Sequence, residues 1–253
     1  MPESLNQSIT DQAPAGQDPQ TYVLVHGGYH GAWCWKTVAN RLRASGHTVY
    51  TPTLTGLGER SHLLHVNPSI ETFIQDVAQV LHYEELSNVI LVGHSFGGSV
   101  VSALADRMPE RLRHLVYLDA QLLQSGQAPV DTVSPETIEV YRQRAVATGG
   151  VSVPPGPPEN FGISDPQMIE WVKKLLTPHP YRTYFDKLSL EHPLGNGKPV
   201  TYIACSKPYF ANIASSREYA KAQDRWRYLE IATGHDAMLT EPEELTRMLE
   251  DIC

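Results

Sequence analysis

One serine of this 253-residue chain stands in a setting that favours covalent chemistry. The residues Gly93-His94-Ser95-Phe96-Gly97-Gly98 form a G-x-S-x-G pattern after the apolar run 87–92, and a small-residue stretch, 97–107, follows them. There a serine occupies a tight strand-to-helix turn, and unpaired helix amides favour negative charge beside it. The alternative is an ordinary serine in a glycine-rich turn. We predict that Ser95 is a nucleophile.

A serine hydroxyl needs a base, and histidine is the usual one because its pKa lies near neutrality. Among eleven histidines, His235 follows the last strand-like run, 227–231, within Thr233-Gly234-His235-Asp236. The carboxyl ends of parallel strands gather active sites, and the order serine then histidine fits a G-x-S-x-G enzyme. We predict that His235 is the base.

The other histidines have simpler explanations. His94 is part of the serine turn, and His26 and His30 lie in a loop without a neighbouring carboxylate or cysteine, so we predict no metal site. We expect the other histidines that we considered to lie in solvated loops. They are His62, His65, His179 and His192.

A carboxylate should orient the histidine. The segment 205–210, after the strand-like run 200–204, contains none, whereas Asp119 ends the apolar run 112–118. A carboxylate at such a position is costly to bury unless it is paired. We therefore choose Asp119, with Asp224 and Glu218 as weaker alternatives and a structural turn cap as the other interpretation.

An oxyanion hole requires two backbone amides near the nucleophile. Phe96 follows Ser95 and supplies one of them. The glycine-rich turn His26-Gly27-Gly28 ends the first strand-like run, 21–25, and predicts Gly28 as the other, with Tyr29 in reserve.

The elements that must position these residues alternate between strand-like and helical patterns. This alternation predicts an α/β fold with a mostly parallel central sheet and helices on both faces. The Pro-rich segment 153–158 is flanked by helical stretches at 135–147 and 166–176, which predicts a helical cap insertion over about 121–198. Thr240 and Glu243 predict a capping box for the last helix, with Pro242 in its first turn. We expect a flexible tail at 1–20 and one domain at 21–253.

The cap should supply an apolar pocket for substrate. The candidate lining residues are Tyr29, Phe161, Trp171, Tyr181 and Met238, although simple packing is the alternative for each.

The composition fits a globular protein, with 41% hydrophobic and 19% charged residues. The net charge of -8 argues against nucleic-acid binding, and no apolar run is long enough to span a membrane. Three cysteines without C-x-x-C spacing and a polar N-terminus favour a reducing, cytoplasmic location. We expect a small-molecule ester substrate and no cofactor. The sequence leaves open whether the protein forms a homodimer.

Three segments together carry a family resemblance: residues 26–35, 93–98 and 234–236. They resemble the branch of the α/β-hydrolases that holds plant methyl esterases, hydroxynitrile lyases and related bacterial esterases. The resemblance spans about residues 21–253, is strongest before Ala120 and is weak through the cap. It implies the α/β-hydrolase fold and supports Gly28 and Phe96 as the oxyanion-hole residues.

Two departures from the plant members are informative. Those members carry their acid after the penultimate strand, whereas Leu118-Asp119-Ala120 resembles bacterial esterases and carbamate hydrolases. The lyases place a lysine beside the histidine, and this chain has Asp236 there. We therefore predict a carboxylesterase-type serine hydrolase that cleaves a small ester, carbamate or lactone through an acyl-enzyme. The alternatives are a carbon–carbon lyase, a cofactor-free oxygenase and a non-catalytic ligand receptor on the same fold.

Overall fold

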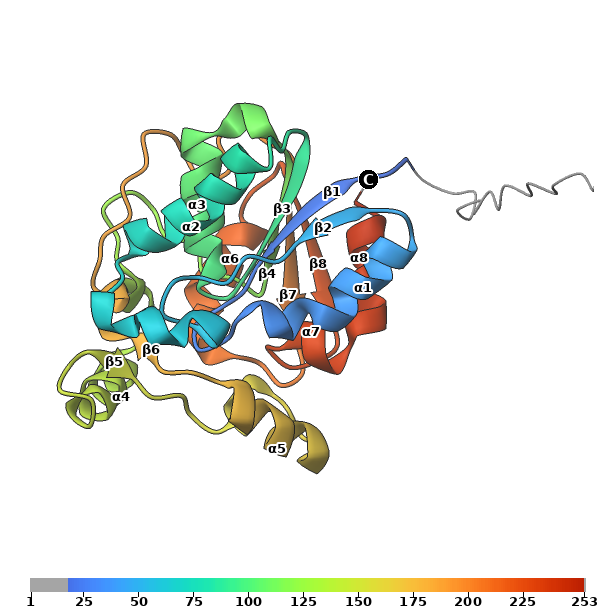
Figure 1. Ribbon diagram of the computed structural model, residues 1–253. Coiled ribbons are helices and arrows are strands. Elements are labelled where there is room, and N and C mark those ends of the chain that lie inside the picture. Colours follow the sequence, from blue (N-terminus) through green and yellow to red (C-terminus); the bar gives the residue numbers. More distant parts are fainter. Residues whose placement is uncertain (1–17, 253) are drawn as a thin grey trace, which may run out of the picture.

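The computed structural model describes residues 18–252. Six parallel strands form the central sheet in the order β2-β1-β3-β4-β7-β8. Their bounds are β1 Thr21–Val25, β2 Thr48–Tyr50, β3 Val89–His94, β4 Leu112–Leu118, β7 Val200–Cys205 and β8 Trp226–Ile231. The predicted α/β fold with a parallel sheet is confirmed, and Figure 1 shows the strands running side by side through the centre of the molecule.

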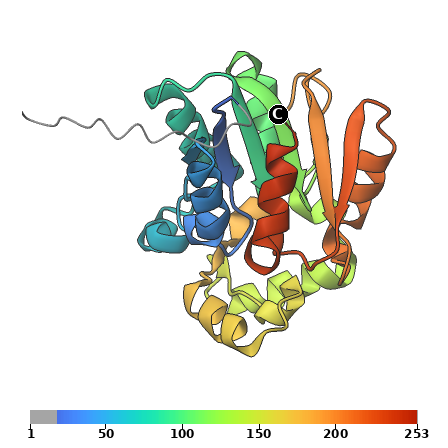
Figure 2. The same cartoon turned by 90° about the vertical axis from the view of Figure 1, so that its right-hand side faces the viewer.

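Helices cover both faces of the sheet because the strands bury side chains on both. In β1, Val23 and Val25 belong to one hydrophobic cluster and Tyr22 and Leu24 to another, as the two-residue period of a strand requires. The first cluster includes residues of α2 (Ile70–Tyr83), α3 (Gly97–Arg107) and α6 (Ala214–Lys221). The second includes residues of α1 (Lys36–Ala44), α7 (Ala237–Thr240) and α8 (Pro242–Glu250), which Figures 1 and 2 show on the opposite side.

The long connection between β4 and β7 forms a layer beyond one end of the sheet. It contains α4 (Pro135–Val146), α5 (Pro166–Leu175) and the two short antiparallel strands β5 (Ser152–Val153) and β6 (His179–Pro180). Figures 1 and 2 show this layer below the main body, where the sheet strands end. Its helices α4 and α5 lie within the stretch, about 121–198, over which we expect a cap insertion.

Short 3-10 helices complete the connections. They are η1 Ala32–Trp35, η2 Gly58–Val66, η3 Pro109–Arg111, η4 Pro129–Thr132, η5 Pro158–Phe161, η6 Tyr181–Tyr184 and η7 Ala211–Ile213.

The predicted capping box of α8 is wrong. The N-cap residue is Glu241 and makes no side-chain capping bond. The hydroxyl of Thr240 instead bonds the hydroxyl of Thr233 at 2.7 Å and donates to the Asp236 carbonyl at 3.2 Å. The pattern did locate the start of a helix, because α8 begins at Pro242. The Thr240 hydroxyl, however, bonds Thr233 and Asp236 and not an amide of that helix.

Most of the expected N-terminal tail, residues 1–17, lies outside the described residues. Gln20, the last residue of that expectation, is buried, and its backbone N–H donates to Nδ1 of His47 at 3.2 Å. Within residues 18–252, no helix is both long enough and apolar enough to cross a membrane.

Candidate active site

Ser95 lies in the sharp turn between β3 and α3, where the chain adopts a backbone conformation unusual for a side-chain-bearing residue. Its φ angle is 52°, in the left-handed region, where most residues are strained. The turn is held by Ser95 N–H, which donates to the Leu118 carbonyl at 3.2 Å, and by the Ser95 carbonyl, which accepts from Gln121 N–H at 2.9 Å. Ser95 is half-buried and lines a cavity between the sheet and the long connection from β4 to β7.

The tight turn also depends on Gly97. A Cβ atom at Gly97 would lie 2.9 Å from the carbonyl oxygens of Val25 and His26, which is closer than real Cβ contacts allow. Glycine therefore lets the first turn of α3 approach the end of β1. This close approach brings the loop after β1 beside Ser95.

His235 bridges Ser95 and Asp119. Its Nε2 lies 2.8 Å from Oγ of Ser95, and its Nδ1 lies 2.7 Å from Oδ2 of Asp119. A carboxylate can only accept, so Nδ1 carries the proton and Nε2 faces the hydroxyl with its lone pair. The three residues that the sequence selected thus form one connected chain of hydrogen bonds, although Ser95 and His235 are 140 positions apart.

Asp119 is fully buried, and its charge is compensated by an arginine that the sequence analysis did not identify. Arg217 of α6, itself buried, donates to Oδ1 from Nη2 at 2.6 Å and from Nε at 2.9 Å. Cys205 N–H donates to the same oxygen at 3.0 Å. Burial alone lowers the pKa of Arg217, but the charge and hydrogen bonds of Asp119 outweigh it and the pKa is raised. No local pattern around Arg217 distinguishes it from a surface arginine, so the sequence could not identify it.

The two alternative acids lie elsewhere. Glu218 is exposed and faces Lys221 at 3.9 Å, and Asp224 is exposed as well. Neither is within hydrogen-bonding distance of His235, whose Nδ1 is occupied by Asp119.

Gly28 and Phe96 both line the cavity that contains Ser95. Within residues 18–252, neither of their backbone amides donates a hydrogen bond to another protein group. A Cβ atom at the preceding residue, Gly27, would lie 2.8 Å from Cβ of Ser95, so the loop comes this close only as glycine. Two unengaged backbone amides beside a serine are what an oxyanion hole requires.

His26 fixes the direction of the Gly28 amide. Leu54 N–H donates to Nε2 of His26 at 3.0 Å, so Nδ1 carries the proton and donates to the Gly27 carbonyl at 2.8 Å. Burial lowers the pKa of His26 to about 3, which keeps the ring neutral. In a planar trans peptide the C=O and N–H point in opposite directions. The hydrogen bond from His26 therefore directs the Gly28 N–H away from the His26 side of the loop.

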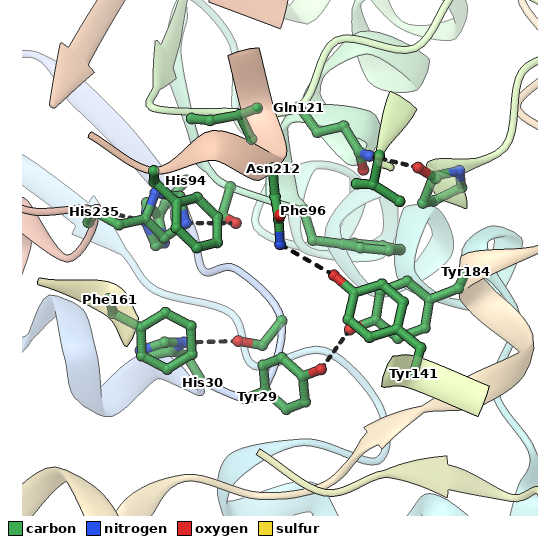
Figure 3. Close-up of a pocket in the computed structure, with 16 residues that line it drawn as sticks. Tyr29, His30, His94, Phe96, Gln121, Tyr141, Phe161, Tyr184, Asn212 and His235 are labelled. Carbon is green, nitrogen blue, oxygen red and sulfur yellow. Dashed lines mark hydrogen bonds between the residues drawn. The ribbon is translucent and has the colours of Figure 1, made fainter. Parts of the chain in front are cut away.

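The cavity over Ser95 holds about 580 Å³ of space, including the part that is open to solvent. Figure 3 shows His235 and Phe161 at one end and a group of tyrosines at the other. The ring of Phe210 stacks on the His235 imidazole with the ring centres 4.0 Å apart. The apolar part of the lining is formed by Phe96, Pro129, Val133, Phe161, Phe210 and Ile213.

The far end of the cavity is polar. The hydroxyl of Tyr184 donates to that of Tyr29 at 2.8 Å, and Nδ2 of Asn212 lies 3.5 Å from the hydroxyl of Tyr141 (Figure 3). A hydrogen bond of 3.5 Å is long, so the Asn212 amide is weakly satisfied within the protein. Gln121 also lines the cavity and donates to Thr132 Oγ1 at 2.7 Å. A ligand could therefore form hydrogen bonds at this end.

The expected pocket residues divide into two groups. Tyr29 and Phe161 line the cavity, whereas Trp171, Tyr181 and Met238 do not. Trp171 is 45% exposed on α5 and packs edge-on against Trp33. The other two pack elsewhere, Tyr181 against Phe185 and Met238 within the hydrophobic cluster that includes α1 and α8. The sequence identified these side chains as aromatic or apolar but could not show which surface each one covers.

Other cavity residues were missed, namely His30, Gln121, Pro129, Val133, Tyr141, Tyr184, Phe210, Asn212 and Ile213. Most of them lie in the connection between β4 and β7 or in the loop after β7. Their positions depend on how those segments fold over the sheet, which no short sequence pattern records.

Residues 18–252 contain no group of three or more His, Cys, Asp or Glu side chains that could hold a metal ion. The nitrogens of His26 are both engaged in the hydrogen bonds described above. Cys34 and Cys205 are buried free thiols.

Comparisons with known proteins point in one direction. A model described as the alpha/beta hydrolase family matches residues 22–248. A carbendazim hydrolyzing esterase from Nocardioides sp. (strain SG-4G) is 36% identical over 239 residues, which are 90% of this chain and 97% of that protein. Methylesterase 10 from Arabidopsis thaliana is 24% identical over 91% of this chain and 90% of its own length.

A solved structure agrees with the relatives found by sequence. It is an extracellular alpha/beta-hydrolase from a Paenibacillus species, described as sharing structural and functional homology with tobacco salicylic acid binding protein 2. Its TM-score is 0.82 at 25% identity, with 92% of this chain and 98% of that chain covered.

Proposed function

The chain belongs to the alpha/beta hydrolase family, and from this membership we propose that it cleaves small carboxylic esters with Ser95 as nucleophile. Its relatives include esterases over nearly the whole chain, and the protein is an ester-cleaving hydrolase of the carboxylesterase type acting on a small molecule. The observation that carries the mechanism is the chain of hydrogen bonds from Ser95 through His235 to Asp119.

In the first half of the reaction, Oγ of Ser95 attacks the carbonyl carbon of the ester as Nε2 of His235 takes the hydroxyl proton. Asp119 holds the tautomer with its proton on Nδ1 and stabilises the imidazolium that forms. The negative charge that develops on the carbonyl oxygen accepts hydrogen bonds from the amides of Gly28 and Phe96. His235 then gives its proton to the departing alkoxide, which leaves as the alcohol, and an acyl-Ser95 remains.

In the second half, water attacks the acyl carbon as Nε2 of His235 takes one of its protons. The tetrahedral species again places its charge in the same hole. Its collapse breaks the bond to Oγ, and His235 returns the proton to Ser95. The products are the carboxylic acid and the alcohol, and the enzyme regains its starting state without a cofactor.

The substrate class follows from the cavity and from the relatives. The cavity is mainly aromatic near Ser95 and polar at its far end, which suits a small ester with an apolar or aromatic part. Two relatives are named as a carbendazim hydrolyzing esterase and a methylesterase, so carbendazim and methyl esters should be among the substrates tested. Carbamates and lactones are also candidate substrates, because each offers a carbonyl carbon that Ser95 can attack as it attacks an ester. The lyase, oxygenase and receptor alternatives are not favoured by these relatives.

We place the protein in the cytoplasm as part of the same proposal. Buried free thiols at Cys34 and Cys205 support a reducing compartment.

The test is covalent labelling combined with turnover. A serine-directed phosphonate should add one group to the purified protein, and peptide mass spectrometry should find it on Ser95. Ser95→Ala should abolish labelling and leave only a residual rate, about 10³- to 10⁴-fold above water. Ser87→Ala, at an exposed serine, is the matched control and should behave as wild type. Labelling at another serine, or full turnover by Ser95→Ala, would refute the mechanism.

A further inference from the structure

A second histidine–carboxylate pair lies directly beside the proposed catalytic residues. Nε2 of His30, in the loop after β1, lies 3.1 Å from Oδ2 of Asp236, the residue that follows His235. The side chain of His30 is 1% exposed and that of Asp236 is fully buried. The proposed mechanism uses neither residue, and a buried ionic pair that only stabilised the fold would be an expensive way to do so.

The ring of His30 has an acceptor on each side. Its Nδ1 lies 2.7 Å from the Gly28 carbonyl, and its Nε2 faces the Asp236 carboxylate. Both partners are oxygen acceptors, so the ring is placed to donate from both nitrogens, as an imidazolium does. Burial opposes the charge, but the Asp236 charge and the two hydrogen bonds outweigh burial and raise the pKa of His30 above 6.5.

The acceptor of the Nδ1 bond belongs to the proposed oxyanion loop. Three successive carbonyls of this loop each accept a hydrogen bond: Gly27 from His26, Gly28 from His30, and Tyr29 from Thr177 N–H at 2.9 Å. Since C=O and N–H oppose each other in a peptide, these bonds set the direction of every amide in the loop. Gly28 has no intrinsic backbone preference, and Tyr29 is held at φ 67°, where a tyrosine is strained. Both therefore depend on external bonds to keep their orientation.

We propose that His30 and Asp236 act as a positioning pair that locks the Gly28–Tyr29 peptide. This peptide adjoins the Gly27–Gly28 peptide, which carries the proposed oxyanion-hole amide, so the lock limits rotation at Gly28 and keeps that amide in place for the transition state. His26 locks the preceding peptide as a neutral ring, and His30 locks the following one as a cation. This inference rests on the proposed function, because it assigns a purpose to the loop only if an oxyanion forms at Ser95.

The surroundings of His30 keep the pair in place. Trp33 stacks on the His30 ring with the centres 5.3 Å apart, and Phe161 contacts it edge-on from the cap. The titratable groups that face the pair are His94, with its ring centre 6.0 Å from that of His30, the neutral His26, and the thiols of Cys34 and Cys205 near Asp236. Burial, followed by the nearby histidines, lowers the pKa of His94, so His94 does not compete with His30 for a proton.

The first experiment replaces His30 with phenylalanine, which keeps a ring against Trp33 and removes both hydrogen bonds. We expect kcat to fall by about 10- to 100-fold, less than or comparable to the loss of a whole oxyanion donor, with KM within about 2-fold. A trifluoromethyl ketone analogue of the substrate, which forms an oxyanion on Ser95, should bind more weakly by the same factor. The binding of the product carboxylic acid should change by less than about 2-fold, and the exposed His82→Phe is the matched control.

The second experiment separates charge from hydrogen bonding. In Asp236→Asn, the amide can donate to Nε2 of a neutral His30, which still donates from Nδ1 to Gly28. Asp236→Ala leaves the ring without a partner. We therefore expect the order of kcat to be wild type, then Asp236→Asn, then Asp236→Ala. The opposite order for the two variants would overturn the inference.

A third measurement does not depend on the folding of any variant at position 30. In protein labelled with ¹⁵N-histidine, one ring should titrate with its midpoint above 6.5, and Asp236→Asn should lower that midpoint. A midpoint at or below 6.5, or a His30→Phe variant with wild-type kcat and ketone affinity, would refute the positioning pair. Wild-type protein that neither turns over esters nor reacts with the phosphonate would instead refute the proposed function.

Discussion

Arg217 donates two hydrogen bonds to Oδ1 of Asp119, at 2.6 and 2.9 Å, and leaves Oδ2 to accept from Nδ1 of His235. The two oxygens of one buried carboxylate thus have separate tasks. One oxygen is neutralised by the guanidinium, and the other orients the imidazole. This division permits a charged acid to end β4 in the interior without the large cost of an unpaired charge.

Removal of Arg217 should therefore destabilise the fold. Arg217→Met leaves the Asp119 charge buried without its cation, and loss of one partner of such a pair costs about 3–5 kcal/mol. We expect the free energy of unfolding in urea to fall by that amount. Arg142→Met is the control, because the exposed Arg142–Glu139 pair contributes at most about 1 kcal/mol. Equal losses in the two variants would contradict this account of Arg217.

Replacement of Asp119 tests the choice of acid. Asp119→Asn keeps the shape of the side chain, but its amide can donate to Nδ1 and so select the wrong tautomer of His235. We expect kcat to fall by about 10⁴-fold with KM little changed. Asp224→Asn, at the exposed alternative, should retain normal turnover. Near-normal activity of the Asp119 variant would show that another group orients His235.

Gly27 should be intolerant of a side chain for a reason of space. The added Cβ of Gly27→Ala would lie 2.8 Å from Cβ of Ser95 and 2.9 Å from Nδ1 of His94, so the loop and the nucleophile must separate. Loss of one oxyanion donor costs about 10²- to 10³-fold in kcat, and we expect an effect of this size. Gly46→Ala has no atom within 4 Å of its new Cβ and should lower stability by about 1 kcal/mol while turnover is kept. Similar kinetics of the two variants would argue against the crowding at Gly27.

Phe210 should matter more to catalysis than Trp171, although the sequence favoured Trp171 as a pocket residue. Phe210→Ala removes the ring that stacks on His235 and lines the cavity. Loss of about 1.5–3 kcal/mol of apolar contact corresponds to a fall of about 10- to 100-fold in kcat/KM. Trp171→Ala should change kcat/KM by less than about 2-fold, because its side chain lies on the outer surface of α5. A larger effect for Trp171 would restore the original expectation.

Acid should destabilise the protein through His26 and His179. Burial lowers the pKa of each to about 3 in the folded state, with a smaller contribution from His26 to the shift of His179. The unfolded chain regains a pKa near 6.5, so between pH 6.5 and 3 it binds more protons than the folded protein. Stability must then fall as the pH falls, by about 1.4 kcal/mol per pH unit for each group.

Urea unfolding between pH 6.5 and 4.5 measures this slope. His179→Phe removes one of the two groups and should make the slope shallower by about 1.4 kcal/mol per pH unit. His82→Gln, at an exposed position, should leave the slope unchanged. An unaltered slope in His179→Phe would mean that His179 is not neutral in the folded protein.

Local sequence determined the parts of this protein that depend on short-range physics. The buried strands are runs of apolar residues that can be recognised one at a time, and the serine turn is specified by glycines at fixed distances from Ser95. Asp119 could be chosen because it directly follows a strand, and His235 because it lies in the turn after one; parallel strands bring their carboxyl ends to one edge. The predicted fold class was confirmed for this reason, and Ser95 and Asp119 both lie within hydrogen-bonding distance of His235.

Only the tertiary structure decided which side chains surround that edge. Arg217 lies 98 positions from Asp119, and His30 lies 206 positions from Asp236, so no local pattern links either pair. The same limit applies to the cavity, where Phe210 and Asn212 replace Trp171 and Met238 as lining residues. Apolar periodicity tells which face of a helix is buried. What that face is buried against depends on how distant segments pack, and this is decided only when the whole chain folds.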